Sequence, residues 1–163
     1  MGLVILTGFM GAGKTTAGME LGKKLNLPVY DTDQLLEKKY RMSVKEMFAA
    51  YGEEKFREFE TEMLQHLSEA PAVVTTGGGA VLKEENRHVL KTKGQIFFLY
   101  CDFDVLYDRL KEDTARPLLK EKSKDQIEKL YESRLSCYLD GSVKINTTGK
   151  TPHDIADDII SRL

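Results

Sequence analysis

Residues 8–15 read Gly-Phe-Met-Gly-Ala-Gly-Lys-Thr and follow directly on an apolar run at Leu3 to Leu6. The spacing is that of a Walker A loop, in which glycines let several backbone amides face one phosphate group. Lys14 adds a positive charge for the β- and γ-phosphates, and Thr15 offers a hydroxyl to Mg²⁺. The alternative, a glycine-rich turn that binds nothing, leaves the complete motif unexplained. The stretch therefore predicts a site for nucleotide phosphates.

The segments around this loop predict the fold class. Helical spacing of apolar residues follows the loop, so that a strand precedes it and a helix N-terminus points at the phosphates. Further short apolar runs alternate with stretches of helical period; they lie at Val29–Tyr30, Ala72–Thr75, Ile96–Tyr100 and Val143–Ile145. This alternation is typical of an α/β domain with a parallel sheet covered on both faces. In such a sheet, ligands bind beyond the carboxyl ends of the strands.

The bulk composition predicts one domain over residues 1–163, because a chain of this length with 41% hydrophobic residues can bury a core. The net charge of −2 gives no reason to expect nucleic acid or a membrane surface as partner, and no apolar run is long enough for a membrane span. A cytoplasmic location is expected by default. Cys101 and Cys137 lack metal-ligand spacing and are expected to be ordinary thiols.

Two carboxylates, Asp31 and Asp33, follow the second apolar run. Because they come at a strand end, both are expected to face the phosphate site. One could support a Mg²⁺ ion held by Thr15, and the other could accept the proton of a hydroxyl nucleophile. A plain helix N-cap is the alternative for one of the two.

Two helices are expected next, one capped by Ser43 with Glu46 and a second after Gly52, which together could form a flap over the cleft. In the second helix, Arg57 and Glu60 are one turn apart. Either they form an ordinary surface ion pair, which the spacing alone favours, or Arg57 lies over the cleft.

A second glycine run, Gly77 to Gly79, ends the third predicted strand. Three glycines at the sheet edge favour the close approach of a ligand to backbone amides over a mere turn. A helix from about Val105 is expected to bring Arg109 past the same edge.

The charged segment at 111–124 predicts a surface loop, or a lid that delivers Arg116 when it closes. The next helix is expected to begin with Ser123 and Gln126 as a capping pair and carries Arg134 on its apolar face. A buried cation there needs a partner, whereas a snorkelling arginine at the edge of the face is the alternative.

The chain is expected to end in a helix capped by Thr151 and opened by Pro152. Its apolar face of Ile155, Ile159 and Leu163 is expected to lie in the core.

Taken together, these motifs resemble the shikimate kinase family over essentially the whole chain. The Walker loop alone would name only a superfamily, whereas the motifs together are specific. They are the loop from Gly8, Asp31-Thr32-Asp33, Gly52-Glu53 with Phe56, Arg57 and Glu60, Gly77-Gly78-Gly79, and Ala115-Arg116-Pro117-Leu118-Leu119.

The resemblance implies a three-layer α/β/α P-loop kinase fold, NMP-kinase-like, with a five-stranded parallel sheet, a substrate-binding region at 31–60 and a lid at 111–123. It implies ATP-dependent phosphorylation of the 3-hydroxyl of shikimate to give shikimate 3-phosphate and ADP, in chorismate and aromatic amino-acid biosynthesis. Shikimate and ATP are then the small-molecule partners, with Mg²⁺ as cofactor, and we expect a monomer.

The resemblance also implies residue roles at the acid substrate. Asp33 would contact the ring hydroxyls as base or orienter. Arg57 and Arg134 would clamp the carboxylate, and Gly79 would offer its amide, with Gly78 beside it.

For the nucleotide, the resemblance implies that Lys14 and Arg116 stabilise the transferred phosphoryl group. Thr15 would ligate Mg²⁺ directly and Asp31 through water. The implied ATP site comprises Gly11, Ala12, Gly13, Lys14, Thr15, Thr16, Arg109, Arg116 and Pro152.

Two other readings stay open on the sequence. The chain could be another small-molecule kinase of the same fold, such as a gluconate-type kinase, or a non-catalytic nucleotide-binding relative. A signalling GTPase is disfavoured because no Asn-Lys-x-Asp sequence occurs.

Overall fold

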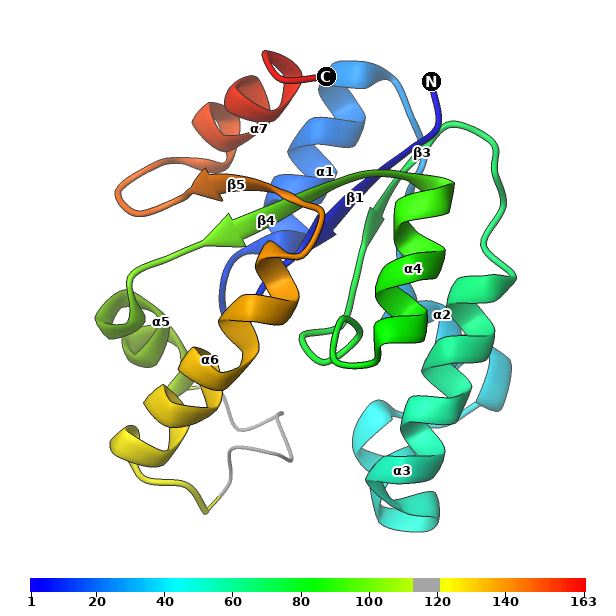
Figure 1. The fold of residues 1–163 in the computed structure, drawn as a ribbon, viewed down its shortest axis with the longest axis vertical. Coiled ribbons are helices and arrows are strands. Elements are labelled where there is room, and N and C mark those ends of the chain that lie inside the picture. Colours follow the sequence, from blue (N-terminus) through cyan, green and yellow to red (C-terminus); the bar gives the residue numbers. More distant parts are fainter. Residues whose placement is uncertain (113–120) are drawn as a thin grey trace.

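The computed structural model describes residues 1–112 and 121–163 and contains a five-stranded parallel sheet of order β2-β3-β1-β4-β5 (Figure 1). The strands are β1 (Leu3–Thr7), β2 (Val29–Asp31), β3 (Ala72–Thr75), β4 (Gly94–Tyr100) and β5 (Val143–Asn146). The helices are α1 (Lys14–Leu25), α2 (Thr32–Tyr40), α3 (Val44–Gln65), α4 (Glu84–Lys93), α5 (Phe103–Leu110), α6 (Lys124–Leu139) and α7 (Pro152–Ile160). The predicted fold class and the five predicted strands are confirmed.

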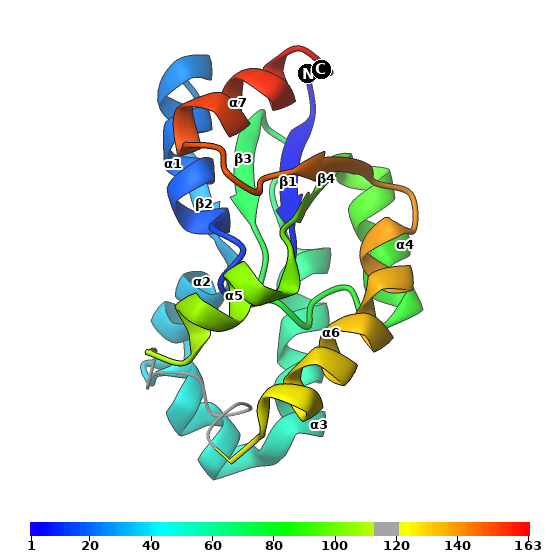
Figure 2. The ribbon, with the colours of Figure 1, turned by 90° about the vertical axis from the view of Figure 1, so that its left-hand side faces the viewer.

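Helices cover both faces of the sheet. Helices α1 and α7 pack against each other on one face, and α4 and α6 lie on the other (Figure 2). The central strand β1 is buried along its whole length, as expected for an uninterrupted apolar run covered from both sides. The carboxyl ends of β1, β2 and β3 lie side by side. The loop from Gly8 follows β1, Asp31 and Asp33 lie at the end of β2, and the run Gly77 to Gly79 follows β3.

The backbone of the phosphate loop explains two of its glycines. Gly11 and Gly13 have φ values of 81° and 86°, in the left-handed region that other residues rarely adopt. Gly13 is the N-cap of α1, and no side chain in the described structure caps this helix. The amides of its first turn are therefore available to an anion.

The two helices predicted on either side of Gly52 form one helix, α3, with a kink. Gly52 has φ 81° and ψ 170°, which breaks the helical path. The Ser43 hydroxyl caps α3 by accepting from the Glu46 amide at 3.1 Å. Helices α2 and α3 pack around a second apolar cluster of their own, with Leu36, Met47 and Phe56 at its centre.

The C-terminal helix begins as predicted, with Thr151 and Asp154 forming a capping box and Pro152 in the first turn. Its residues Ile155 and Ile159 are buried. The prediction of a buried Leu163 is wrong: the helix ends at Ile160, and Leu163 is 42% exposed.

The two cysteines, Cys101 and Cys137, are both free thiols, as expected. Arg116 and most of the predicted lid lie outside the described residues, in the segment 113–120. Among the helices that the structure describes, none has the length and apolar character needed to span a lipid bilayer.

Candidate active site

A cleft of about 430 Å³ lies at the carboxyl ends of the strands and gathers most of the predicted site residues. The phosphate loop and the start of α1 form one wall. Asp31 and Asp33 come from the end of β2, and Arg109 comes from α5. The lining residues are Gly11, Ala12, Gly13, Lys14, Thr15, Thr16, Asp31, Asp33, Thr76, Gly77, Gly78, Arg109, Thr147, Lys150, Pro152 and Ile155.

Side chains hold the phosphate loop from within and from α5. Lys14 Nζ donates to the Gly8 carbonyl at 2.5 Å and to the Phe9 carbonyl at 3.1 Å, so its ammonium group lies over the loop. Arg109 Nη1 donates to the Gly11 carbonyl at 2.8 Å. These contacts hold the loop in its shape, and the N-terminus of α1, which follows the loop, lines the cleft.

Asp31 is the N-cap of α2. Its Oδ1 accepts from the Gln34 amide at 3.1 Å, and its Oδ2 accepts from the Thr75 hydroxyl at 2.9 Å. The capping alternative therefore applies to Asp31. Because each carboxylate oxygen can accept a second bond, this side chain can still hold a water or an ion from the cleft.

Asp33 lies in the first turn of α2 and faces the cleft, close to Gly77. Burial raises the pKa of its carboxyl above the ordinary 3.8, and the nearby charge of Asp31 adds to this. Lys14 and Arg57 act in the opposite direction and favour the ionised form. Asp33 therefore lies between the phosphate loop and the buried arginine.

The pair of Arg57 and Glu60 is buried, so the favoured reading of a surface ion pair is wrong. Arg57 Nη1 lies 2.9 Å from Glu60 Oε1, and Glu60 is only 1% exposed. The ring faces of Phe48 and Phe56 lie 5.9 and 5.4 Å from the guanidinium carbon. Sequence spacing could not reveal this, because the pattern i,i+3 is the same at the surface and in a cleft.

The three glycines after β3 make room for these side chains. A Cβ on Gly79 would lie 2.4 Å from both terminal nitrogens of Arg57, and one on Gly77 would lie 2.7 Å from Asp33 Oδ1. Neither glycine has a φ in the left-handed region. Space, and not backbone conformation, is therefore what requires glycine at these two positions.

Arg134 is also buried, at 4% exposed, and so is not a snorkelling side chain. Its guanidinium carbon lies 5.7 Å from the ring centre of Phe9. The Nε atoms of Arg57 and Arg134 are buried, and neither finds a hydrogen-bond partner among residues 1–112 and 121–163. Both cations act on Glu60: burial raises the pKa of its carboxyl, and first Arg57 and then, more weakly, Arg134 lower it.

Sequence reasoning assigned no binding role to the side chains that hold the glycine loop, which we define as residues 77–83 between β3 and α4. Asn86 and Arg87 donate to its carbonyls from α4, and Tyr138 donates to it from α6. Tyr138 lies on the buried face of α6. Its place on the apolar face gave no sign that its hydroxyl reaches Gly78.

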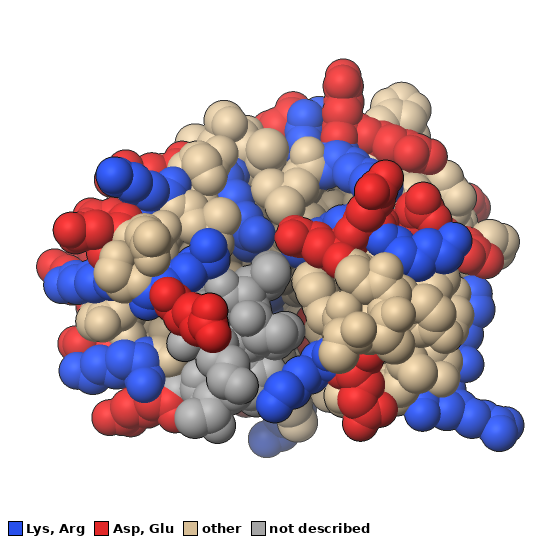
Figure 3. All heavy atoms as spheres, turned by 90° about the horizontal axis from the view of Figure 1, so that it is seen from below, with Lys and Arg blue, Asp and Glu red and all other residues tan. Residues whose placement is uncertain are grey.

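Viewed from the end where α3 and α6 lie, the surface shows acidic and basic side chains intermixed (Figure 3). In contrast to these surface charges, the side chains of Arg57 and Arg134 are buried in the protein. The two arginines that the family resemblance singled out are therefore buried residues and not part of the charged surface.

Comparisons with known proteins agree on one family. A family model described as shikimate kinase matches residues 10–163. A shikimate kinase from Bacillus cereus (strain AH187) is 42% identical over 98% of this chain and 97% of its own length. One from Enterococcus faecalis is 42% identical, with the same shares of both chains covered.

Solved structures extend the comparison to the fold. Shikimate kinase from Acinetobacter baumannii in complex with shikimate superposes with a TM-score of 0.94 at 32% identity, over 99% of this chain and 92% of that one. A gluconokinase from Sinorhizobium meliloti reaches a TM-score of 0.60 at 16% identity, over 98% of this chain and 90% of that one, which shows a shared fold alone.

Proposed function

The chain belongs to the shikimate kinase family, and from this premise we propose that it transfers the γ-phosphoryl group of ATP to the 3-hydroxyl of shikimate. One observation carries the assignment of the acid site: Arg57 and Arg134 are buried, and their Nε atoms have no partner among the described residues. Neither lines the cleft itself, but Arg57 lies against Gly79, next to the lining residue Gly78, and Arg134 lies near Phe9 of the phosphate loop.

Arg57 and Arg134 form the carboxylate clamp of this proposal. A buried N–H group without a partner costs about 1–3 kcal/mol. A planar carboxylate can remove this penalty, because it offers two oxygens to two guanidinium forks. Gly79 lies against the Arg57 guanidinium, since a Cβ at this position would come within 2.4 Å of its terminal nitrogens, so its amide could serve the same carboxylate.

Asp33 would hold the hydroxyl that attacks the γ-phosphate. Its carboxyl faces the cleft and is close enough to Lys14 and Arg57 to sense both charges. Orientation of the hydroxyl is sufficient for a loose transition state, in which little proton removal is needed before the phosphoryl group moves. As the bond to phosphorus forms, the hydroxyl proton can pass to the Asp33 carboxylate.

The nucleotide would bind with its phosphates at the first turn of α1. The free amides there and the Lys14 ammonium neutralise charge on the phosphates. Arg109 and Pro152 line the same cleft, as expected for contacts to the base. Arg116 stays a proposed phosphate contact; it lies outside the described residues.

The residues present fit a Mg²⁺ ion that arrives with ATP. Mg²⁺ usually keeps several waters and takes one or two protein oxygens besides the phosphates. Thr15 would supply one such oxygen directly and Asp31, which lines the same cleft, would hold the ion through water; the ion would neutralise phosphate charge. No cluster of three metal-binding side chains occurs among the described residues, so an all-protein cage is not expected there.

The test of acceptor identity is a coupled assay of ADP release with ATP and Mg²⁺, comparing shikimate, gluconate and AMP. Turnover with shikimate alone is expected. Turnover with gluconate in its place would retain the phosphate site and overturn the assigned acceptor, and no turnover with any acceptor would favour the non-catalytic alternative.

The clamp is tested by Arg57→Ala and Arg134→Ala. Each should raise the KM for shikimate by about 100-fold, because a charged hydrogen-bond partner of the carboxylate is lost, while the KM for ATP changes little. Lys55→Ala is a matched control, since Lys55 lies on the same helix as Arg57 but forms an exposed ion pair with Glu58. Equal losses for both substrates would contradict the clamp.

A further inference from the structure

The glycine loop is held along its length by side chains that donate to its carbonyl groups. Tyr138 Oη donates to the Gly78 carbonyl at 2.6 Å, and Asn86 Nδ2 donates to the Ala80 carbonyl at 2.9 Å. Arg87 Nη1 donates to the Val81 and Leu82 carbonyls at 2.8 and 3.0 Å. Of these donors, only Tyr138 comes from the helix that also carries Arg134.

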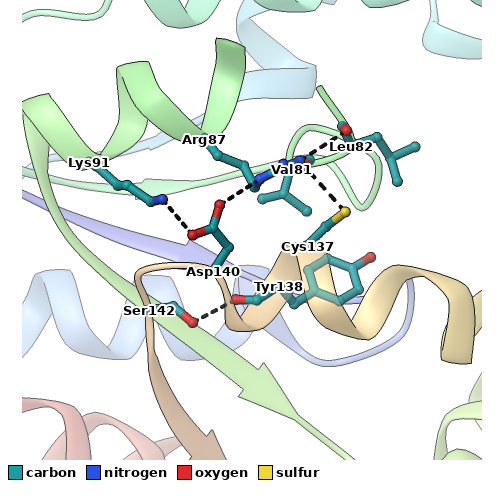
Figure 4. A network of polar contacts seen from close by, with 8 residues as sticks. All are labelled: Val81, Leu82, Arg87, Lys91, Cys137, Tyr138, Asp140 and Ser142. Carbon is teal, nitrogen blue, oxygen red and sulfur yellow. Dashed lines mark hydrogen bonds and ion pairs between the residues drawn. The ribbon is translucent and has the colours of Figure 1, made fainter. Parts of the chain in front are cut away.

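A polar network fastens the end of that helix to α4 and to the loop (Figure 4). Arg87 Nε lies 2.8 Å from Asp140 Oδ2, and Lys91 Nζ lies 2.5 Å from Asp140 Oδ1. Arg87 also contacts the Cys137 sulfur at 3.6 Å. The network fixes the C-terminal end of α6 beside residues 81–82, one turn beyond Arg134.

Tyr138 itself has little freedom. It is 1% exposed, and its ring stacks on Phe98 with a centroid distance of 5.0 Å and an interplanar angle of 12°. Burial raises the pKa of its phenol to about 12, against the lowering effects of the charge and hydrogen bonding of Arg134. The hydroxyl therefore keeps its proton at physiological pH.

The direction of the contacts around this hydroxyl follows from chemistry. A carbonyl can only accept and a guanidinium can only donate. The Tyr138 proton therefore goes to Gly78, and the positive charge of Arg134, one helical turn earlier on α6, acts on the phenol from nearby. The hydroxyl thus fastens the turn of α6 next to the proposed clamp arginine to the loop that presents Gly79.

We propose that Tyr138 is a positioning residue for the acid substrate, whose hydroxyl fixes the part of α6 that carries Arg134 relative to the glycine loop. The inference rests on the proposed function, in which Arg134 and Gly79 bind the same carboxylate. Without the hydroxyl, the arginine and the loop would each have to be ordered when the acid binds, at a cost in affinity.

The test is Tyr138→Phe, which keeps the stacked ring and removes the hydroxyl. The KM for shikimate should rise about tenfold, the order expected when a buried carbonyl loses its hydrogen-bond donor, and the KM for ATP should change less than about twofold. Tyr131→Phe is the matched control: Tyr131 is buried on the same helix and donates to the Cys101 carbonyl at 2.9 Å. It should leave both constants near the wild-type values.

A double-mutant cycle separates positioning from general loosening. If Tyr138 acts through Arg134, then Tyr138→Phe should raise the KM for shikimate by a smaller factor in the Arg134→Ala background than in the wild type. An equal factor in both backgrounds, or an unchanged KM for shikimate in the single variant, would overturn the inference. No effect of Arg134→Ala itself would instead overturn the proposed clamp.

A measurement on the wild-type protein keeps the inference testable if the variant fails to fold. The ¹³Cζ resonance of Tyr138, assigned with variants of the other tyrosines, should shift when shikimate is added and not when ADP is added. A resonance unmoved by saturating shikimate would overturn the inference.

Discussion

At the acid end of the site, formed by Arg57, Glu60 and Arg134, the functional side chains are buried. At the nucleotide end, formed by Thr15, Thr16, Arg109 and the phosphate loop, the named side chains are exposed. The acid end depends on side-chain geometry that packing and hydrogen bonds hold in place. The nucleotide end depends on backbone amides that two left-handed glycines orient.

This difference between the two ends predicts which substitutions should lower activity most. A buried charged site is sensitive to the volume and polarity of every neighbour, because its groups cannot move into water. Where backbone amides make the site, removal of an exposed side chain should remove only the single contact that this side chain makes. We therefore expect large and substrate-specific effects at the acid end and small ones from side chains at the nucleotide end.

The largest effect is expected from Asp33→Asn. Loss of the carboxylate should lower kcat/KM for shikimate by about 10²–10³-fold, within the range for a group that assists proton transfer. Because burial raises the pKa of Asp33, the acid limb of the wild-type pH profile of kcat/KM should lie above pH 3.8 and should vanish in the variant. A profile with an unchanged acid limb would remove Asp33 from this role.

The same substitution should stabilise the fold. A carboxyl whose pKa is raised on folding binds its proton more tightly in the folded state, so stability falls as pH rises through that pKa. At pH 7 the ionised Asp33 therefore opposes folding, and Asp33→Asn should raise the Tm. Asp31→Ala is the contrasting control: it removes the cap of α2 and should lower the Tm.

The next effect in size is expected from Gly79→Ala. Its Cβ would lie 2.4 Å from Arg57, whose movement is restricted by the buried Glu60. Overpacking of this kind costs about 1–3 kcal/mol, so the KM for shikimate should rise tenfold or more while the KM for ATP stays constant.

Gly78→Ala is the matched comparison for Gly79→Ala. Its Cβ would be 3.2 Å from the side chain of Met10, which is flexible and can give way. Kinetic measurements on the two variants should therefore show the larger effect at position 79. Equal effects of the two substitutions would contradict the inference that Arg57 leaves no room for a side chain at position 79.

The smallest effect is expected from Arg109→Ala at the nucleotide end. The variant loses one bond from an exposed side chain to the Gly11 carbonyl, and the loop retains its other contacts. The KM for ATP should rise about two- to fivefold, with the KM for shikimate unchanged. A rise of 100-fold would show that this end also depends on side-chain geometry.

The fold could be predicted because its signals are local. Five apolar runs predicted the strands, the loop from Gly8 was correctly expected to lead into a helix, and the caps at Ser123 and Thr151 were also predicted correctly. These features depend on residues within a few positions of one another.

The acid end could be predicted less well because its contacts join distant segments. Whether Arg57 is buried depends on Gly79, more than 20 positions later, and the partner of Gly78 is Tyr138, 60 positions later. Spacing within one helix carries no information about such neighbours. The family resemblance named Arg57 and Arg134, but the geometry around them came from the structure.

The kink at Gly52 has a consequence for chirality. Among residues 1–112 and 121–163, no heavy atom lies within 4 Å of the place where the Cβ of an L-residue would stand, so the backbone conformation and not space is what favours glycine there. Its φ of 81° with ψ of 170° is the mirror image of an extended conformation that ordinary L-residues adopt. D-alanine in a chemically synthesised chain can adopt this backbone without strain, and the reduced freedom of the unfolded state should then stabilise the fold by about 0.4–1 kcal/mol. L-alanine at the same position should lose stability, so residue 52 selects for handedness.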